Sequence, residues 1–108
     1  MRREELITIA MQGDFGKPQP ALVVQTDQFD RHTTVTVLPA TGTLVDAPLL
    51  RITVEPTPEN GLQKASQVMV DKTMTVKRDK AGPAFGIVEV DTMVQIERCL
   101  AVFLGIAK

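Results

Sequence analysis

Residues 13–25 read GDFGKPQPALVVQ, a loop with two glycines and two prolines that leads into an apolar run. Pro18 and Pro20 each fix φ and lack an N–H donor, so neither is expected inside a sheet ladder. The apolar run that begins at Ala21 is typical of a buried strand. The sequence therefore predicts a polar loop beside a rigid strand, an arrangement in which functional residues are often found.

Further segments on both sides of this stretch have the pattern of short strands. Residues 33–38, TTVTVL, are rich in β-branched residues and alternate, which predicts a strand with one wet face that ends at Pro39. Residues 67–76 are predicted to form the longest strand, and both of its faces mix apolar and polar residues, as in a strand that bends. Five or six short strands of this kind indicate a small, strongly bent antiparallel sheet or barrel.

A helix is predicted at the end of the chain. Asp91 is a favourable N-cap, and Gly105 is a suitable C-terminal stop. Between them an apolar stripe follows helical spacing: Met93, Ile96, Leu100, Phe103 and Leu104.

Length and composition limit the class of protein. A chain of 108 residues predicts one domain over residues 1–108. With 12 basic and 13 acidic residues the net charge is −1, so an RNA site would need a local basic surface. Cys99 is the single cysteine and is expected to pack as a small apolar residue. One histidine, no phosphate-binding glycine motif and no apolar run of about 18 residues predict no metal, no cofactor and no membrane span, and hence a cytoplasmic protein.

Four blocks of the chain together resemble the MazF/PemK/Kid family of bacterial toxins. They are residues 13–25, VTVLPAT at 35–41, SQVMVDK at 66–72 and AVFLG at 101–105, in the family's order over nearly the whole chain. The resemblance implies a mainly β, SH3-like small antiparallel barrel (CcdB/PemK-like) with a C-terminal helix, forming a homodimer. It also implies a metal-independent endoribonuclease that cuts single-stranded RNA at short sequences. Its partner would be a cognate antitoxin whose disordered tail folds across the RNA groove.

RNA cleavage without metal needs a base for the 2′-hydroxyl, an acid for the leaving oxygen and a cation for the charged intermediate. Toxins of this family use a Ser or Thr after the proline of the third strand, which matches Thr41. We expect Thr41 to contact the scissile phosphate. The alternative is a hydroxyl that caps the loop, since threonine favours turns.

The family's other catalytic residue is an Arg at the start of the second strand, and here that position is Gln19. Glutamine carries no charge and is neither an acid nor a base. Removing a cation aimed at transition-state charge costs about a hundredfold or more in rate, so we expect a weak or inactive nuclease. A natural or an introduced inactivating change would account for Gln19. Glu4 is a second departure, because the family usually has a glycine before its first strand.

Further RNA contacts are expected in the glycine loop and in the long strand. The loop candidates are Gly13, Asp14, Phe15, Gly16 and Lys17. Lys17 could partly replace the missing cation, or it is a solvated loop lysine. Gln67 and Asp71 would share a strand face at the RNA groove, with Asp71 in catalysis; the alternative for Asp71 is an ion pair with Lys72 or Arg51. His32 could act as a base near neutral pH, but its place in a turn favours an exposed surface role.

Two other classes of function remain open. CcdB toxins share the barrel and bind gyrase through a terminal Trp-Gly-Ile; this chain ends LGIAK, with Gly-Ile but no Trp. A degenerate toxin would keep only antitoxin binding or dimerisation. Thr41 and the glycine loop favour the nuclease, the missing Trp argues against gyrase binding, and Gln19 favours the degenerate toxin.

Overall fold

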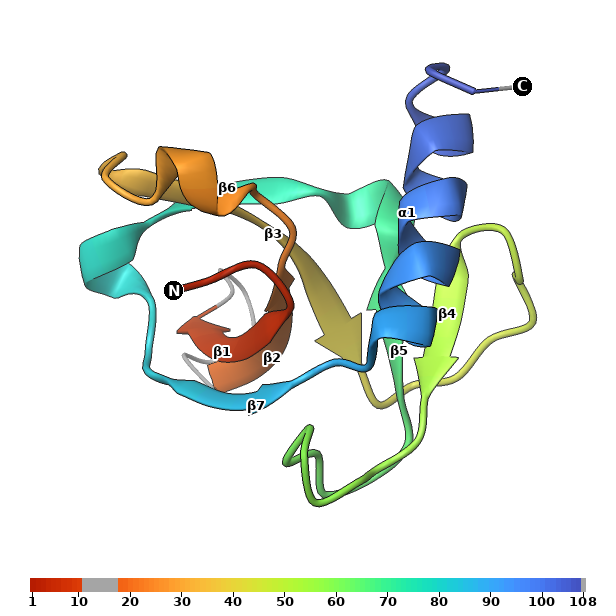
Figure 1. Ribbon diagram of the computed structural model, residues 1–108. Coiled ribbons are helices and arrows are strands. Elements are labelled where there is room, and N and C mark those ends of the chain that lie inside the picture. The colour runs from red at the N-terminus through yellow and green to blue at the C-terminus, as the bar shows by residue number, and fades with distance from the viewer. Residues whose placement is uncertain (11–17, 108) are drawn as a thin grey trace.

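The chain folds into a curved antiparallel sheet with one helix at its C-terminal end (Figure 1), in a computed structural model that describes residues 1–10 and 18–107. This confirms the mainly β class expected from the sequence. The described elements are β1 (Glu5–Ala10), β2 (Pro18–Val23), η1 (Asp27–Phe29), β3 (Thr34–Thr41), β4 (Arg51–Val54), β5 (Ser66–Met69), η2 (Val70–Lys72), β6 (Met74–Lys77), η3 (Arg78–Lys80), β7 (Ala84–Ile87) and α1 (Val90–Phe103), where η marks a short 3-10 helix.

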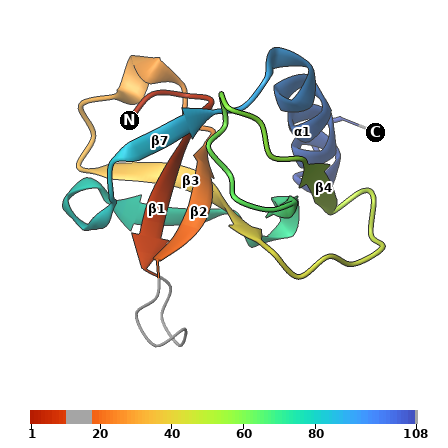
Figure 2. The ribbon, with the colours of Figure 1, turned by 90° about the horizontal axis from the view of Figure 1, so that it is seen from below.

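The sheet is organised around β3. The strand order is β4-β5-β3-β2-β1-β7, and β6 also pairs with β3. The first half of β3 pairs with β6, and its end pairs with β5. The sheet therefore bends along β3, because the two halves of this strand have different partners. Figure 2 shows β7, β1, β2 and β3 side by side, with α1 beyond them. The result is a half-barrel.

Alternation along the central strands produces two apolar cores. Leu6, Leu22 and Leu38 stand opposite one another across β1, β2 and β3 and are completely buried on the side of the helix. Their neighbours point to the other face, because successive side chains of a strand alternate. That second core consists of Ile7, Ile9, Ala21, Val23, Val35 and Val37. Burial on both faces explains why the apolar run in β2 is continuous.

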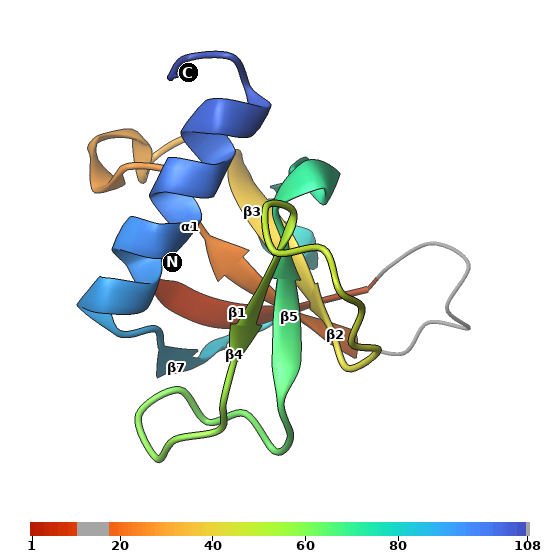
Figure 3. The same ribbon diagram turned by 90° about the vertical axis from the view of Figure 1, so that its right-hand side faces the viewer.

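The helix α1 covers the first core with its N-terminal half. It begins at Val90 with Glu89 as the N-cap residue, so the expected cap at Asp91 is wrong, and Asp91 lies in the first turn. Met93 and Ile96 are buried as predicted. The last turn projects beyond the sheet (Figure 3), which leaves the end of the apolar stripe about half exposed. In the described chain no helix is long and apolar enough to cross a membrane.

Two expectations about prolines are wrong. Pro18 and Pro20 lie inside β2, opposite Ala10 and Thr8 of β1. They are tolerated because β3 pairs with β2 only from residue 21 to 23, so the outer part of β2 has an edge where no donor is needed. Pro39 does not end its strand either; it lies where β3 leaves β2 and begins to pair with β5.

The predicted long strand over residues 67–76 is divided. It forms β5, then the 3-10 turn η2, then β6. Val70 at the break is fully buried; its N–H donates to Leu50 O at 2.9 Å, and its carbonyl accepts from the Thr73 hydroxyl at 3.0 Å. The mixed faces of this segment, interpreted as a bend, therefore reflect a strand interrupted by one turn.

Candidate functional site

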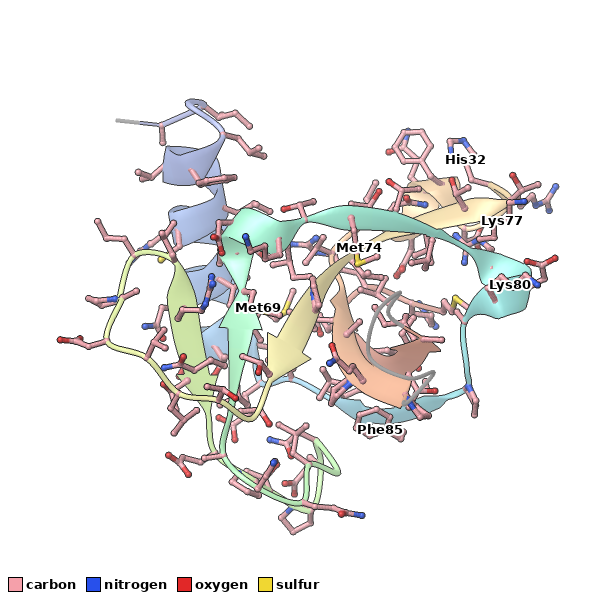
Figure 4. All side chains as sticks on the ribbon, turned by 180° about the vertical axis from the view of Figure 1, so that it is seen from behind. His32, Met69, Met74, Lys77, Lys80 and Phe85 are labelled. Atoms are coloured by element: carbon pink, nitrogen blue, oxygen red, sulfur yellow. The ribbon has the colours of Figure 1, made fainter. Side chains whose placement is uncertain are left out.

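A groove of about 570 Å³ lies where β2, β3, β5, η2 and β6 meet. Figure 4 shows its side of the molecule, with Met69 and Met74 labelled. The described residues that line it are Gln19, Pro39, Thr41, Met69, Asp71, Lys72, Thr73 and Met74. The three catalytic candidates of the sequence, Gln19, Thr41 and Asp71, thus come together from three separate elements.

Gln19 reaches the groove through the alternation of β2. It shares a strand face with Ala21 and Val23, which are buried in the second core. Gln19 itself stands opposite Ile9 of that core and is half-buried. Its amide can donate to and accept from a ligand but brings no charge.

Thr41 is the last residue of β3 and is half-buried in the groove wall. Its Oγ1 accepts a hydrogen bond from the Thr43 N–H at 3.1 Å, so the capping interaction considered as an alternative is present. A hydroxyl that accepts in this way still has its own O–H to donate. The turn therefore holds Thr41 Oγ1 in place without using its donor.

Asp71 is part of an ion-pair chain. Its Oδ1 accepts from the Arg51 guanidinium, and both side chains are less than a fifth exposed. Its Oδ2 lies 3.8 Å from the Nζ of Lys72, which is 58% exposed at the groove. Both ion pairs considered for Asp71 are thus present. The two cations outnumber the single carboxylate, so this wall of the groove is not an acidic surface.

Gln67 lies elsewhere. It is only 5% exposed, and its amide bonds the backbone of Val45 twice, at 3.0 Å each, and the Thr53 hydroxyl at 3.2 Å. The shared face expected for Gln67 and Asp71 does not exist, because η2 interrupts the alternation between them. Gln67 positions the loop after β3, while Asp71 faces the groove.

The structure adds groove residues that the sequence analysis did not select. Lys72 is the basic residue among the described lining, and Thr73, Met69 and Met74 complete the wall. The sequence held a signal for them, since Lys72, Thr73 and Met74 follow Asp71 in order, and both Met69 and Lys72 lie in a block that carries the family resemblance. The loop candidates Gly13, Asp14, Phe15, Gly16 and Lys17 lie outside the described residues.

Two other residues singled out in the sequence lie away from the groove. His32 is exposed, and its ring is 5.2 Å from that of Phe29. Cys99 is partly buried and packs against the core under the helix. Neither lines the groove, which fits the surface role expected for His32 and the packing role expected for Cys99.

Comparison with known proteins places the chain in one family. Residues 2–104 match the family described as PemK-like, MazF-like toxin of type II toxin–antitoxin system. A curated relative, the probable endoribonuclease MazF of Mycolicibacterium smegmatis, is 47% identical over 108 residues, which is 99% of each chain.

Solved structures of toxins have the same fold as this chain. An endoribonuclease from a mycobacterial species, in complex with its cognate antitoxin, has a TM-score of 0.79 and 26% identity, covering 100% of this chain and 98% of that chain. A MazE–MazF complex from Deinococcus radiodurans has a TM-score of 0.79 at 16% identity, covering 99% and 98%, and shows the fold alone. The family resemblance of the sequence is confirmed, and the chain belongs to the PemK-like, MazF-like family of toxins of type II toxin–antitoxin systems.

Proposed function

We propose that this chain is a single toxin domain that binds single-stranded RNA in the groove and cleaves it without metal at short sequences, at a rate lowered by Gln19. The observation that carries the proposal is the convergence of Gln19, Thr41, Asp71 and Lys72 on one groove. A hydroxyl, a carboxylate, an ammonium and an amide side by side suit recognition and displacement at a phosphodiester.

The reaction is an internal displacement. The ribose 2′-oxygen forms a bond to the adjacent phosphorus and the bond from phosphorus to the 5′-oxygen breaks. The departing 5′-oxygen takes a proton from water, so the products carry a 2′,3′-cyclic phosphate and a 5′-hydroxyl. Asp71 Oδ2 accepts the 2′-hydroxyl proton, since its contact with Lys72 at 3.8 Å exceeds hydrogen-bond length, whereas Oδ1 is held by Arg51. Thr41 donates to a phosphate oxygen, and Lys72 faces the charge that develops there.

Gln19 lowers the rate of cleavage expected at this site. An amide can hydrogen-bond a phosphate oxygen, but it supplies none of the positive charge that a guanidinium would direct at the transition state. Lys72 is mostly exposed, so water screens its charge and it replaces that cation only in part. The groove is therefore expected to bind RNA better than it cleaves it.

The same groove is the surface at which we expect an antitoxin to bind. A mycobacterial relative was solved in complex with its cognate antitoxin, and we expect an antitoxin of this chain to lay a segment that folds on binding across the groove. RNA and antitoxin would both be met in the cytoplasm. The exposed apolar end of α1 is the surface at which we expect two copies to form a homodimer.

The decisive experiment is cleavage of a long single-stranded RNA in the presence of EDTA. The Gln19→Arg variant should cleave about a hundredfold or more faster than the unmodified chain. Gln19→Ala is the matched control and should not gain activity. Adding Thr41→Val to the Gln19→Arg variant should remove the gain, because the phosphate loses its hydroxyl donor.

One outcome would favour the second candidate. If the Gln19→Arg variant cleaves no RNA while the chain still binds an antitoxin, the groove is not a nuclease site. The chain would then be a degenerate toxin that retains antitoxin binding, the function that Gln19 itself favours.

A further inference from the structure

We propose that a second hollow, on the opposite side of β2, binds one nucleotide of the same RNA strand that the groove cleaves; this rests on the proposed function. The second hollow measures about 450 Å³, within the range of small-molecule sites. Its described lining is Thr8, Pro18, Pro20, Gly42, Gly61, Leu62, Gln63, Lys64, Ser66 and Phe85. This lining contains one basic residue and no acidic one.

The two depressions share a wall that is one strand thick. On β2, Gln19 lines the groove while Pro18 and Pro20 on either side of it line the second hollow. At the end of β3, Thr41 lines the groove while the next residue, Gly42, lines the second hollow. An RNA strand whose phosphate meets Thr41 would therefore reach the second hollow by crossing the end of β3.

The ring of Phe85 supplies a stacking surface. Gly61 has φ +68°, and a Cβ there would lie 2.7 Å from the Phe85 carbonyl oxygen and 3.2 Å from its ring. The glycine thus lets the ring lie directly against the loop before β5, while Phe85 remains 37% exposed. Figure 4 shows Phe85 on β7, away from His32 and Lys77. A base can stack on such a ring whatever its identity.

The loop that faces Phe85 is fixed before any ligand arrives. Asn60 is 3% exposed, and its Oδ1 accepts from the N–H groups of Thr57 and Leu62 at 3.0 and 2.9 Å. Its Nδ2 donates to the carbonyl of Glu55 at 2.8 Å. A site built in advance costs less ordering when it binds.

Lys64 places a cation between the two depressions. Its side chain passes over Gly42, where a Cβ would lie only 2.6 Å from the ammonium nitrogen. The Lys64 carbonyl accepts from the buried Ser66 hydroxyl at 3.1 Å, which positions the backbone of this residue. The ammonium therefore lies beside the residue that follows Thr41, where the phosphate between the two bound nucleotides would pass. This charge and the aromatic ring favour RNA over an apolar partner.

The test is binding of eight-nucleotide 2′-O-methyl RNAs, one for each base, measured by fluorescence anisotropy; these probes lack the attacking hydroxyl and are not cleaved. Phe85→Leu should weaken binding about tenfold, the loss of one stacked base. Phe85→Tyr should retain it. Lys64→Gln should lower the slope of log K against log salt by about 0.7, the value for one phosphate on a single strand.

Matched controls are a similarly exposed phenylalanine and a distant lysine. Phe29→Leu on η1 and Lys80→Gln on η3 should leave affinity and slope unchanged. Thermal unfolding identifies any variant that fails to fold, and the salt slope of Lys64→Gln then carries the comparison. If Phe85→Leu and Lys64→Gln bind like the unmodified chain while Gln19→Arg binds more tightly, RNA uses the groove alone and the second hollow is not a nucleotide site.

Other results overturn the inference in different ways. If Phe85→Leu leaves RNA binding intact but weakens antitoxin binding, the second hollow belongs to a protein partner. If no RNA binds and the Gln19→Arg variant cleaves none, the proposed function fails together with this inference.

Discussion

Glu4 is the one described residue other than glycine whose backbone has a positive φ. It has φ +80°, a region that residues with a Cβ seldom adopt. Its N–H donates to Val23 O at 3.0 Å and its carbonyl accepts from Val88 N–H at 2.9 Å, so both neighbouring segments hold it there. The family resemblance placed a glycine at this position, and this geometry explains the preference.

The Glu4→Gly variant should relieve this strain. A residue with a Cβ in the left-handed region destabilises the folded state by about 1–2 kcal/mol. Glycine removes this strain, but its greater freedom in the unfolded chain offsets about 0.5–1 kcal/mol of the gain. We therefore expect the free energy of unfolding in urea to rise by up to about 1.5 kcal/mol. Glu4→Ala keeps the Cβ and should bring no such rise; equal stabilisation by both variants would mean that the side chain, not φ, is responsible.

The Arg51–Asp71 ion pair should show a measurable coupling. It joins β4 to the turn η2 that interrupts the predicted long strand, and its two side chains are largely shielded from water. A double-mutant cycle with Arg51→Met and Asp71→Asn, followed by urea unfolding, should give a coupling energy of about 1–2 kcal/mol. The same cycle on Arg2 and Asp27, an exposed pair at 3.6 Å, should give less than about 0.5 kcal/mol. Similar values for both pairs would show that the shielding of Arg51 and Asp71 adds nothing.

At the scale of elements, β7 depends on its close approach to the loop before β5. A Cβ on Gly86 would lie 1.9 Å from the carbonyl oxygen of Asn60, and the neighbouring Ile87 N–H donates to Glu59 O at 2.9 Å. Neither backbone can move without loss of these contacts. The strand therefore requires the smallest residue at this position.

Gly86→Ala should lower the free energy of unfolding by about 3 kcal/mol or more, because the new methyl group would overlap the backbone of Asn60. Gly105→Ala is the matched control: φ is +76° but nothing lies within 4 Å, so only the conformational cost of about 1 kcal/mol applies. Chemical denaturation of both variants measures the difference. A smaller loss for Gly86→Ala than for Gly105→Ala would contradict the close packing of β7.

At the scale of the whole molecule, the helix end presents an apolar surface without a partner in the described chain. Val102 and Phe103 at the end of α1, and Leu104 and Ile106 just after it, are between 47% and 78% exposed. Figures 1 and 3 show this end of the helix projecting beyond the sheet. Adjacent exposed apolar residues are typical of interfaces between chains. This is the surface assigned above to the homodimer.

Phe103→Glu should convert a dimer into a monomer, since a charge would be placed in the centre of the interface. Analytical ultracentrifugation over a range of concentrations measures the change. Phe29→Glu replaces a similarly exposed phenylalanine on η1 and should leave the assembly unchanged. A monomeric unmodified chain, or a dimer that tolerates Phe103→Glu, would place the interface elsewhere.

The sequence was sufficient wherever the signal is local or repeats along the chain. Alternation predicted the buried positions Val35 and Val37 of β3, although the face expected to be wet is half-buried at Thr34 and Thr36 and buried at Leu38, and the apolar run that follows Pro20 correctly indicated a buried strand. Matching blocks were sufficient to identify the family and to select Gln19, Thr41 and Asp71, which share the groove. These properties depend on residue type and spacing alone.

Only the tertiary structure decided which neighbours those residues meet. Pro18 and Pro20 are accepted in β2 because β3 leaves the sheet before reaching them. Gln67 is turned away from Asp71 because a buried Val70 interrupts their strand. The Arg51–Asp71 pair and the second hollow join segments far apart in the chain. Such features arise from pairing and packing between distant strands, and the pattern of any one segment does not contain that information.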